Sequence, residues 1–379
     1  MTTDTLGIYI HVPFCASKCY YCDFCSVSAA KQEKIDAYVK ALINEMTEFA
    51  RGYDCKFKVD TLYFGGGTPT LLSVENFADI LTAAGDLFEL LPDAEITAEA
   101  NPKTASQDKL CSMRQLGINR LSIGMQSVHN TELKALGRIH SYEDFESFYT
   151  DARCAGFDNI SVDLMYGIPE QTMESFEQSV TKLAELSPEH ISSYCLKIEE
   201  GTKFYKRREL LVLPDEDTVS DMYEKMGHIL QSAGYNKYEI SNFSRPHRES
   251  RHNTKYWTYD DYIGFGSGAH SFFGGKRFAN SRDIDVYILS NGLGVSEGEE
   301  IISPTEAENE YIMLGMRLAC GIDIREYETR FKKDFYESFG KKFGKFSPEF
   351  VFLSDNNCKF TEKGMFVSNY ILSETLDFS

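Results

Sequence analysis

The chain has no long hydrophobic run, and none of its apolar stretches approaches the roughly 20 residues that a helix needs to cross a bilayer. Its opening stretch, MTTDTLGIYIHVPF, has no basic start and only a short apolar run, so it does not resemble a signal peptide. These two absences argue against a membrane-spanning or exported protein. We therefore expect a soluble protein of the cytoplasm.

Basic residues are scarce relative to acidic ones. There are 39 Lys and Arg against 58 Asp and Glu, which gives a formal net charge of −19. A surface this acidic repels phosphate backbones and anionic lipid, so we expect no nucleic-acid partner.

What the chain does have is typical of a globular protein. Of its 379 residues, 42% are hydrophobic and 26% are charged. A chain of this length exceeds one simple core, so we expect a large domain and a smaller one. Six of the ten cysteines are widely scattered and are expected to be reduced thiols: Cys55, Cys111, Cys154, Cys195, Cys320 and Cys358.

Short β-branched runs alternate with longer amphipathic segments over the first two-thirds of the chain. Strands are predicted over 7–12, 59–64, 95–101, 119–126, 159–167, 190–198 and 235–243. Helices are predicted over 34–50, 106–116, 129–156, 173–186 and 216–233, with a further helix that Ser73 can cap. This alternation predicts a parallel sheet with right-handed crossovers, either open or closed toward a barrel.

Chemically capable residues follow the predicted strands. A cysteine-rich loop follows the first strand, GGGTPT follows the second, Glu99 lies at the end of the third, Gln126 ends the fourth and Asp163 closes the fifth. The carboxyl ends of parallel strands are where α/β barrels build their sites. Short polar residues also simply terminate strands, but five such positions on one edge favour a site.

The last third of the chain departs from this pattern. We expect a core domain over 1–240, a loop-rich segment over 241–303, and an accessory domain over 304–379. Helices followed by a hairpin make the accessory domain a small α+β, winged-helix-like module. Because it shows no clear basic recognition face, we interpret it as a lid or docking module rather than a DNA reader.

Four cysteines lie close together in HVPFCASKCYYCDFC: Cys15, Cys19, Cys22 and Cys25. Thiolates are soft ligands that suit zinc or an iron–sulfur cluster. The first spacing, Cys-x3-Cys, is unusual for zinc knuckles, and no second Cys or His pair follows at zinc-finger distance. The loop therefore predicts an iron–sulfur centre.

Cys15, Cys19, Tyr21 and Cys22 resemble the signature of the radical S-adenosylmethionine (SAM) enzymes, in which an aromatic residue precedes the third cysteine. The resemblance implies that three cysteines bind three irons of a [4Fe-4S] cluster and that the fourth iron stays open for SAM. An open coordination position is the general requirement for catalysis at a metal. By the same resemblance Tyr21 lines the adenine, and Cys25 is not a ligand.

The resemblance also implies the rest of the SAM pocket: Tyr9, Gly66, Gly67, Thr68, Glu99, Gln126, Arg138 and Asp163. Glycines let the backbone approach a ligand, carboxylates accept hydrogen bonds, and an arginine pairs with the SAM carboxylate. Each also has a structural alternative. The glycine run is compatible with a turn, Arg138 with a surface ion pair, and Tyr9 with core packing.

Two further runs, SIGMQSVHNTELKALGRIHS and DLMYGIPEQT, narrow the resemblance to the oxygen-independent coproporphyrinogen III oxidases and their relatives, the radical SAM haem chaperones. The likeness covers nearly the whole chain and implies a partial (β/α)6 TIM-like barrel. Two departures favour the chaperones. Phe24 replaces an additional cysteine of the oxidases, and only eight residues precede Tyr9, where the oxidases have a longer extension.

The run HNTKYW matches a His-Asn-x-x-Tyr-Trp motif of the haem chaperones through His252, Asn253, Tyr256 and Trp257. Imidazole is a common axial ligand of haem, and Tyr and Trp offer flat faces to a macrocycle. The alternative is a structural corner in which His252 bonds to the backbone. His270 is a second candidate, for which we expect a structural role.

Taken together, the residues predict a radical SAM haem chaperone with a [4Fe-4S] cluster and SAM, and an oxygen-independent coproporphyrinogen III oxidase is the alternative. The resemblance implies haem as cargo, an apo-haemoprotein acceptor such as a respiratory enzyme, a low-potential electron donor, and transient contact with membrane proteins. A tRNA-modifying radical SAM enzyme fits less well, because the chain is acidic and has no recognisable RNA-binding appendage.

Overall fold

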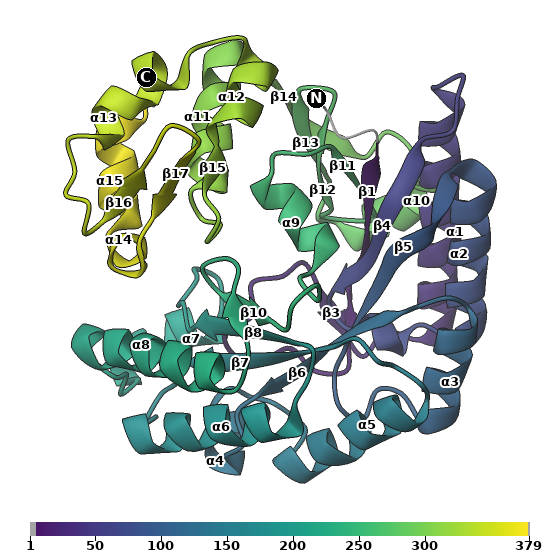
Figure 1. Cartoon of the computed structure of the whole chain (residues 1–379). Helices are drawn as coiled ribbons and strands as arrows, with labels where there is room; N and C mark the ends of the chain where they lie inside the picture. The colour runs from purple at the N-terminus through teal and green to yellow at the C-terminus, as the bar shows by residue number, and fades with distance from the viewer. Residues whose placement is uncertain (1–4, 378–379) are drawn as a thin grey trace.

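Six parallel strands in sequence order form the centre of the fold in the computed structural model, which describes residues 5–377 (Figure 1). They are β1 (Leu6–Val12), β4 (Lys58–Gly66), β5 (Glu89–Ala100), β6 (Arg120–Gln126), β7 (Ile160–Tyr166) and β8 (His190–Cys195). Each pairs in parallel with the next. This confirms the predicted partial barrel, although β8 ends three residues before the predicted limit and Asp163 lies inside β7 rather than at its end.

Helices cover the outer side of these strands (Figure 1). They are α1 (Gln32–Arg51), α2 (Val74–Leu87), α3 (Gln107–Gln115), α5 (Tyr142–Cys154), α6 (Met173–Leu186) and α8 (Glu216–Ser232). Helix α1 buries Ile35, Val39, Leu42 and Met46, which recur at helical spacing. Ser73 caps α2 as predicted, because its hydroxyl accepts from the Asn76 amide in a capping box.

The predicted helix over 129–156 is instead two helices, α4 (Asn130–Ala135) and α5. Between them Gly137 adopts a φ of +74°, and a Cβ built there would lie 2.6 Å from the ring of Tyr20. Two residues mark this interruption in the sequence: Gly137, and Ser141, which caps α5 in a capping box with Asp144. The break turns Arg138 away from the outer layer toward the end of the strands.

The segment 241–303 is not loop-rich, contrary to our prediction. It contains β10 (Asn242–Ser244), α9 (Arg251–Trp257), β11 (Tyr262–Phe265), β12 (His270–Phe273), β13 (Lys276–Asn280), α10 (Ile284–Leu289) and β14 (Ser296–Ile301). Strand β11 pairs in parallel with β1, on the side opposite β4. These strands are short and most are separated by turns that contain glycine, which is why their period is weak in the sequence.

The predicted strand over 235–243 is likewise a short antiparallel pair, β9 (Asn236–Lys237) with β10, and β10 extends the main sheet beyond β8. At the other side, β12, β13 and β14 continue the sheet antiparallel from β11. Buried residues of the 241–303 segment, including Ile263, Phe265 and Tyr287, belong to the same hydrophobic core as the parallel strands.

The C-terminal part stands beside the open side of the sheet (Figure 1). Its main helices are α11 (Pro304–Gly315), α12 (Ile324–Phe331) and α15 (Ser368–Thr375), and its sheet joins β15 (Ile322–Asp323), β17 (Asn357–Phe360) and β16 (Val351–Leu353). Short helices α7 (Lys203–Lys206), α13 (Lys341–Phe343) and α14 (Glu362–Phe366) complete the chain. A second core, built around Ile312, Tyr327 and Phe343, confirms the small α+β module. Residues 1–4 and 378–379 of the predicted domains lie outside the described part.

Over residues 5–377, no helix combines the length and the apolarity that a membrane span requires.

Glu45 of α1 ties the 241–303 segment to the barrel. Its carboxylate accepts hydrogen bonds from the Gly266 amide at 2.9 Å, from Asn280 Nδ2 at 2.6 Å and from the Tyr287 hydroxyl. Burial raises the pKa of Glu45 to about 7, and these three hydrogen bonds oppose the rise only in part. The folded protein therefore binds this proton more tightly than the unfolded chain does.

A pH dependence follows from the raised pKa of Glu45. Its contribution to stability is complete below the ordinary pKa of 4.5 and is lost as the pH rises through about 7. The Glu45→Gln variant should lose less unfolding free energy than the wild type between pH 5 and pH 8, by up to about 3 kcal/mol. Urea unfolding at the two pH values measures the difference. An equal loss in both proteins would show that Glu45 is ionised throughout this range.

Candidate cluster and cofactor site

The cysteine loop lies between β1 and α1, at the carboxyl ends of the parallel strands. A short parallel pair, β2 (Phe14–Cys15) with β3 (Val27–Ser28), closes its base. The Tyr20 amide donates to the Leu136 carbonyl at 3.0 Å, and the Phe204 amide donates to the Tyr20 carbonyl at 2.9 Å. The loop is therefore held against the strand ends from two sides.

Three of its thiols are close enough to influence one another. Burial raises the pKa of Cys15 and of Cys22, and the neighbouring thiol of Cys19 adds to both shifts. Thr68 Oγ1 lies 3.8 Å from Cys15 Sγ, and Arg138 Nη1 lies 3.6 Å from Cys19 Sγ. Donors of this kind stabilise thiolates, so the three sulfurs fit a soft metal centre.

No group of three or more His, Cys, Asp or Glu side chains in the described part of the chain is arranged to hold a single metal ion. That finding concerns one ion bound by converging ligands. In a [4Fe-4S] cluster each thiolate binds a different iron, so the sulfurs stand farther apart than in a mononuclear site. That Cys15, Cys19 and Cys22 hold such a cluster stays a prediction.

Cys25 lies on another side of the loop. Its thiol donates to the Arg282 carbonyl at 3.3 Å, and a Cβ at Gly268 would lie 3.1 Å from its sulfur. Cys25 thus contacts the segment around β12 and β13. That Cys25 is not a cluster ligand stays a prediction, and this contact favours it.

Glu99 and Asp163 lie inside the same end of the barrel. Glu99 accepts from the Gly66 amide at 3.0 Å and from the Tyr63 hydroxyl at 2.9 Å. Burial, with the nearby charge of Asp163, raises the pKa of Glu99 to about 7. Burial also raises the pKa of Asp163 to about 6, while a 3.1 Å hydrogen bond from Ser122 opposes the rise. Both carboxylates are available as acceptors for a polar ligand.

Arg138 is not part of a surface ion pair. One of its Nη2 hydrogen bonds goes to the Gly124 carbonyl at 2.7 Å and another to Asn101 Oδ1. Asn101 in turn donates to Thr68 Oγ1 at 2.9 Å. Thr68, Asn101 and Arg138 therefore form one hydrogen-bonded chain beside the cysteine loop.

The glycine run has a structural reason of its own. Gly66 adopts a φ of +108°, and a Cβ there would lie 2.4 Å from the His11 ring. A Cβ at Gly67 would lie 2.6 Å from the Phe14 carbonyl oxygen. These glycines let β4 lie directly against β1 and the start of the cysteine loop, whether or not a ligand is bound.

The other predicted SAM residues differ in their surroundings. Gln126 is buried at the end of β6 with a φ of +70°, and Tyr21 joins a small apolar cluster with Leu136 and Phe204. The hydroxyl of Tyr9 bonds to His11 Nδ1 at 3.0 Å, and its ring stacks with that of Tyr63. The ring of Tyr9 therefore packs in the core, which is the structural alternative named for it, and its hydroxyl also supports the cysteine loop through His11.

The His-Asn-x-x-Tyr-Trp residues lie on α9 and point in different directions. His252 is buried, with Nδ1 bonded to Thr61 Oγ1 and Nε2 to the Tyr256 hydroxyl, each at 2.9 Å. Trp257 lies under the guanidinium of Arg317, which is 5.7 Å from its ring centre. Asn253 lies in the first turn of α9. Both ring nitrogens of His252 are therefore engaged within the protein, by side-chain hydroxyls rather than by the backbone carbonyls or amides that the structural alternative named.

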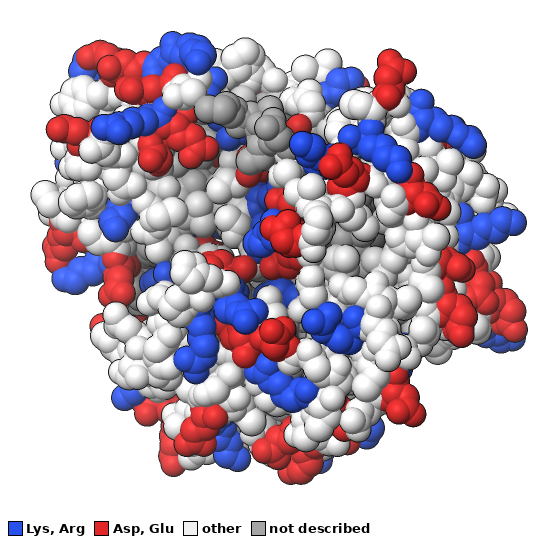
Figure 2. All heavy atoms as spheres, turned by 45° about the vertical axis from the view of Figure 1, so that its right-hand side comes forward, with Lys and Arg blue, Asp and Glu red and all other residues white. Residues whose placement is uncertain are grey.

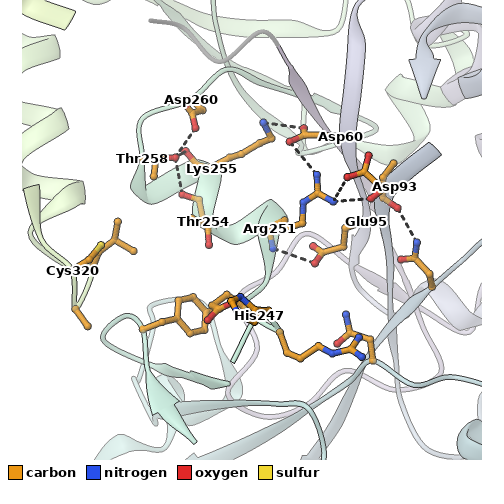
Figure 3. Close-up of a pocket in the computed structure, with 18 of the residues that line it drawn as sticks. Asp60, Asp93, Glu95, His247, Arg251, Thr254, Lys255, Thr258, Asp260 and Cys320 are labelled. Carbon is orange, nitrogen blue, oxygen red and sulfur yellow. Dashed lines mark hydrogen bonds and ion pairs between the residues drawn. The ribbon is translucent and has the colours of Figure 1, made fainter. Parts of the chain in front are cut away.

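A cavity of about 900 Å³ lies at the other end of the strands (Figure 3). Several charged side chains of its lining form ion pairs with one another. Lys255 and Arg251 both form ion pairs with Asp60, and Arg251 also pairs with Asp93. Cys320 of the C-terminal part faces it from the opposite side. This cavity is separate from the cysteine loop and shares none of its lining residues with the predicted SAM pocket.

Acidic and basic side chains are interspersed on the face shown in Figure 2, and no continuous basic stripe crosses it. This distribution resembles an ordinary solvated surface, in keeping with the net charge of −19.

Sequence reasoning missed three residues of this region. Asn101 links Thr68 to Arg138, Ser122 bonds to Asp163, and His11 bonds to the Cys25 carbonyl at 2.8 Å through Nε2. Only Asn101 carries a signal in the sequence, because it directly follows β5, whereas His11 and Ser122 lie inside β1 and β6.

Comparisons with known proteins agree with this geometry. The radical SAM superfamily model matches residues 9–183, and the HemN C-terminal domain model matches residues 302–367. The heme chaperone HemW of Lactococcus lactis subsp. lactis (strain IL1403) is 36% identical over 371 residues, covering 97% of this chain and 96% of the relative. The heme chaperone HemW of Escherichia coli (strain K12) is 37% identical, covering 80% of this chain and 79% of the relative.

The chain belongs to the HemW family of radical SAM proteins.

Its likeness to the solved coproporphyrinogen III oxidase HemN from Escherichia coli is one of fold. The two superpose with a TM-score of 0.85 over 98% of this chain and 89% of that chain, at 24% sequence identity. HemW membership confirms the resemblance drawn from the motifs, and the radical SAM family implies a [4Fe-4S] cluster and SAM. The assignment of individual cofactor residues remains a prediction.

Substitution of Gly66 tests the close approach of the two strands. Gly66→Ala should lower the unfolding free energy by at least about 2 kcal/mol, because it combines a left-handed φ with a clash against His11. Gly85→Ala is the matched control. A Cβ at Gly85 in α2 meets nothing within 4 Å, and the change should raise helix stability by about 0.5–1 kcal/mol. Equal effects of both changes in urea unfolding would contradict this explanation.

Paired serine variants test the ligand set. Cys22→Ser should abolish cluster incorporation, since the radical SAM signature implies that Cys22 is a ligand, whereas Cys25→Ser should incorporate a full cluster. The measurement is iron and sulfide content with the Fe–S charge-transfer absorbance, after anaerobic reconstitution. Loss of the cluster in Cys25→Ser would make Cys25 a ligand and close the fourth iron.

Proposed function

We propose that this chain binds haem and delivers it to apo-haemoproteins. The observation that carries the proposal is the similarity to curated heme chaperones over nearly the whole of both chains. The likeness to HemN gives the fold alone and does not select the oxidase. Phe24 of the cysteine loop stands where the oxidases carry an additional cysteine, which favours the chaperone, and its side chain is 63% exposed.

We further propose that Cys15, Cys19 and Cys22 hold a [4Fe-4S] cluster, and that SAM binds at the strand ends beside it. When bound, this pair supplies a redox-active centre with an open iron. Arg138 and Thr68 would orient the thiolates and the SAM carboxylate through their donors. The buried carboxylates of Glu99 and Asp163 would accept hydrogen bonds from the ammonium or ribose hydroxyl groups.

The proposed cellular setting follows from the same chemistry. All ten cysteines lie within the described residues and none is in a disulfide, which suits a reducing compartment such as the cytoplasm. As partners we propose haem, an apo-haemoprotein acceptor that includes respiratory enzymes at the membrane, and a low-potential electron donor. We also propose that the C-terminal part from residue 304 is a separate unit, since most of its buried residues form a second core, to which the 241–303 segment adds Tyr259 and Phe272.

Parallel assays of the anaerobically reconstituted protein test this function. We expect binding of one haem per chain and transfer to an apo-haemoprotein, without decarboxylation of coproporphyrinogen III. Haem absorption during titration and product analysis of the porphyrinogen measure the two activities. Decarboxylation that depends on SAM, without haem uptake, would instead identify an oxidase.

A further inference from the structure

A second, smaller cavity lies beside the cysteine loop. It has a volume of about 400 Å³, and its walls include Tyr9 of β1, Tyr256 of α9, Tyr262 of β11 and His270 of β12. Phe24 and Cys25 of the cysteine loop close one side, and Arg282 lies at the same opening. The cavity is therefore built by the segment 241–303 against the first strand and the cluster loop.

His270 is the histidine in this cavity with an available ring. Its side chain is exposed at the start of β12, and within the described residues it has no hydrogen bond or ion pair. His11, which lines the same cavity, uses Nδ1 for Tyr9 and Nε2 for the Cys25 carbonyl. An imidazole with a lone pair facing a cavity is a strong ligand for iron.

The walls offer aromatic surface for a flat, apolar ring system. The rings of Tyr256 and Tyr262 meet edge to face with centroids 4.5 Å apart, and Phe24 exposes 63% of its surface at the opening. Large exposed aromatics beside a cavity are typical of binding sites. Arg282 supplies a guanidinium at the same opening, where it can pair with a carboxylate side chain of a ligand.

The larger cavity at the other end of the strands is less suited to such a ligand. Its charges pair with one another across Asp60, Arg251 and Lys255, and Tyr238 is the aromatic residue in its described lining. An apolar macrocycle there would have to displace these ion pairs or cover them without compensation. The smaller cavity has aromatic walls and an unengaged imidazole instead.

We propose that haem binds in the smaller cavity with His270 as an axial ligand of the iron, and that Arg282 pairs with a propionate. This inference rests on the proposed function, because haem as the ligand comes from there. In this site Tyr256 forms part of the wall, and His252 is a positioning residue whose Nε2 hydrogen bond holds the Tyr256 hydroxyl. His252 and Tyr256 of the His-Asn-x-x-Tyr-Trp motif thus support the site without binding the iron.

Titration of the full-length protein, carrying its cluster, with haemin tests the axial ligand. The readouts are the difference absorption spectrum and the low-temperature electron paramagnetic resonance (EPR) spectrum of the ferric haem. His270→Asn should lose the histidine-ligated signature and bind haemin at least about tenfold more weakly. Added imidazole should restore the signature, because it can occupy the vacated position.

His247→Asn is the matched control. His247 is also an exposed histidine, it lines the larger cavity, and its removal should leave the haem spectra unchanged. Thermal unfolding of both variants checks that they fold. Unchanged spectra in His270→Asn, or loss of the signature in His247→Asn, would overturn the assignment. Loss of the signature in Cys25→Ser but not in His270→Asn would overturn it in favour of a thiolate ligand.

The two proposals fail in distinguishable ways. If the wild-type protein takes up no haem, the proposed function is wrong, and the proposed haem site is then wrong as well. If the wild type takes up one haem and His270→Asn does so with identical affinity and spectra, the function stands and only the site is wrong.

Discussion

The close approach of His11 on β1 to the backbone of Gly66 on β4 fixes the candidate site. The missing Cβ at Gly66 gives room to the imidazole, which then bonds to Tyr9 on one side and to the Cys25 carbonyl on the other. The Gly66 amide donates to Glu99 on the next strand. One contact between neighbouring strands therefore sets the position of the cysteine loop, the glycine run and a buried carboxylate relative to one another.

Two parts of the chain converge on this arrangement from opposite sides. The turn between α4 and α5 brings Arg138 to Cys19, and Asn101 joins Arg138 to Thr68. From the other side, the 241–303 segment adds β11 beside β1 and places Arg282 against Cys25. The barrel end thus has a side lined by the early strands, where we propose that the cofactors bind, and a second side formed by the later segment, where the smaller cavity lies.

The sequence alone predicts the alternating strands and helices of the parallel sheet well. Strong strand and helix periods predict the six parallel strands. The cysteine spacing indicates the radical SAM enzymes, and the runs SIGMQSVHNTELKALGRIHS, DLMYGIPEQT and HNTKYW indicate the family to which the chain belongs. Prediction from the sequence failed where local signals are weak or contradict the tertiary structure. A short turn at Gly137 interrupts what looks like one helix, and the strands β11 to β14 are only four to six residues long, too short to show a clear period. The engagement of His252 by Thr61 also depends on a contact between residues 191 positions apart, which no local pattern reveals.

The central claim is that three thiolates of one loop hold a cluster whose fourth iron is free for SAM. EPR spectroscopy of the reduced, anaerobically reconstituted protein, recorded before and after addition of SAM, tests it most directly. The account predicts that SAM shifts the g values of the reduced cluster, because the cofactor coordinates the open iron. A cluster spectrum that is identical with and without saturating SAM would contradict the account.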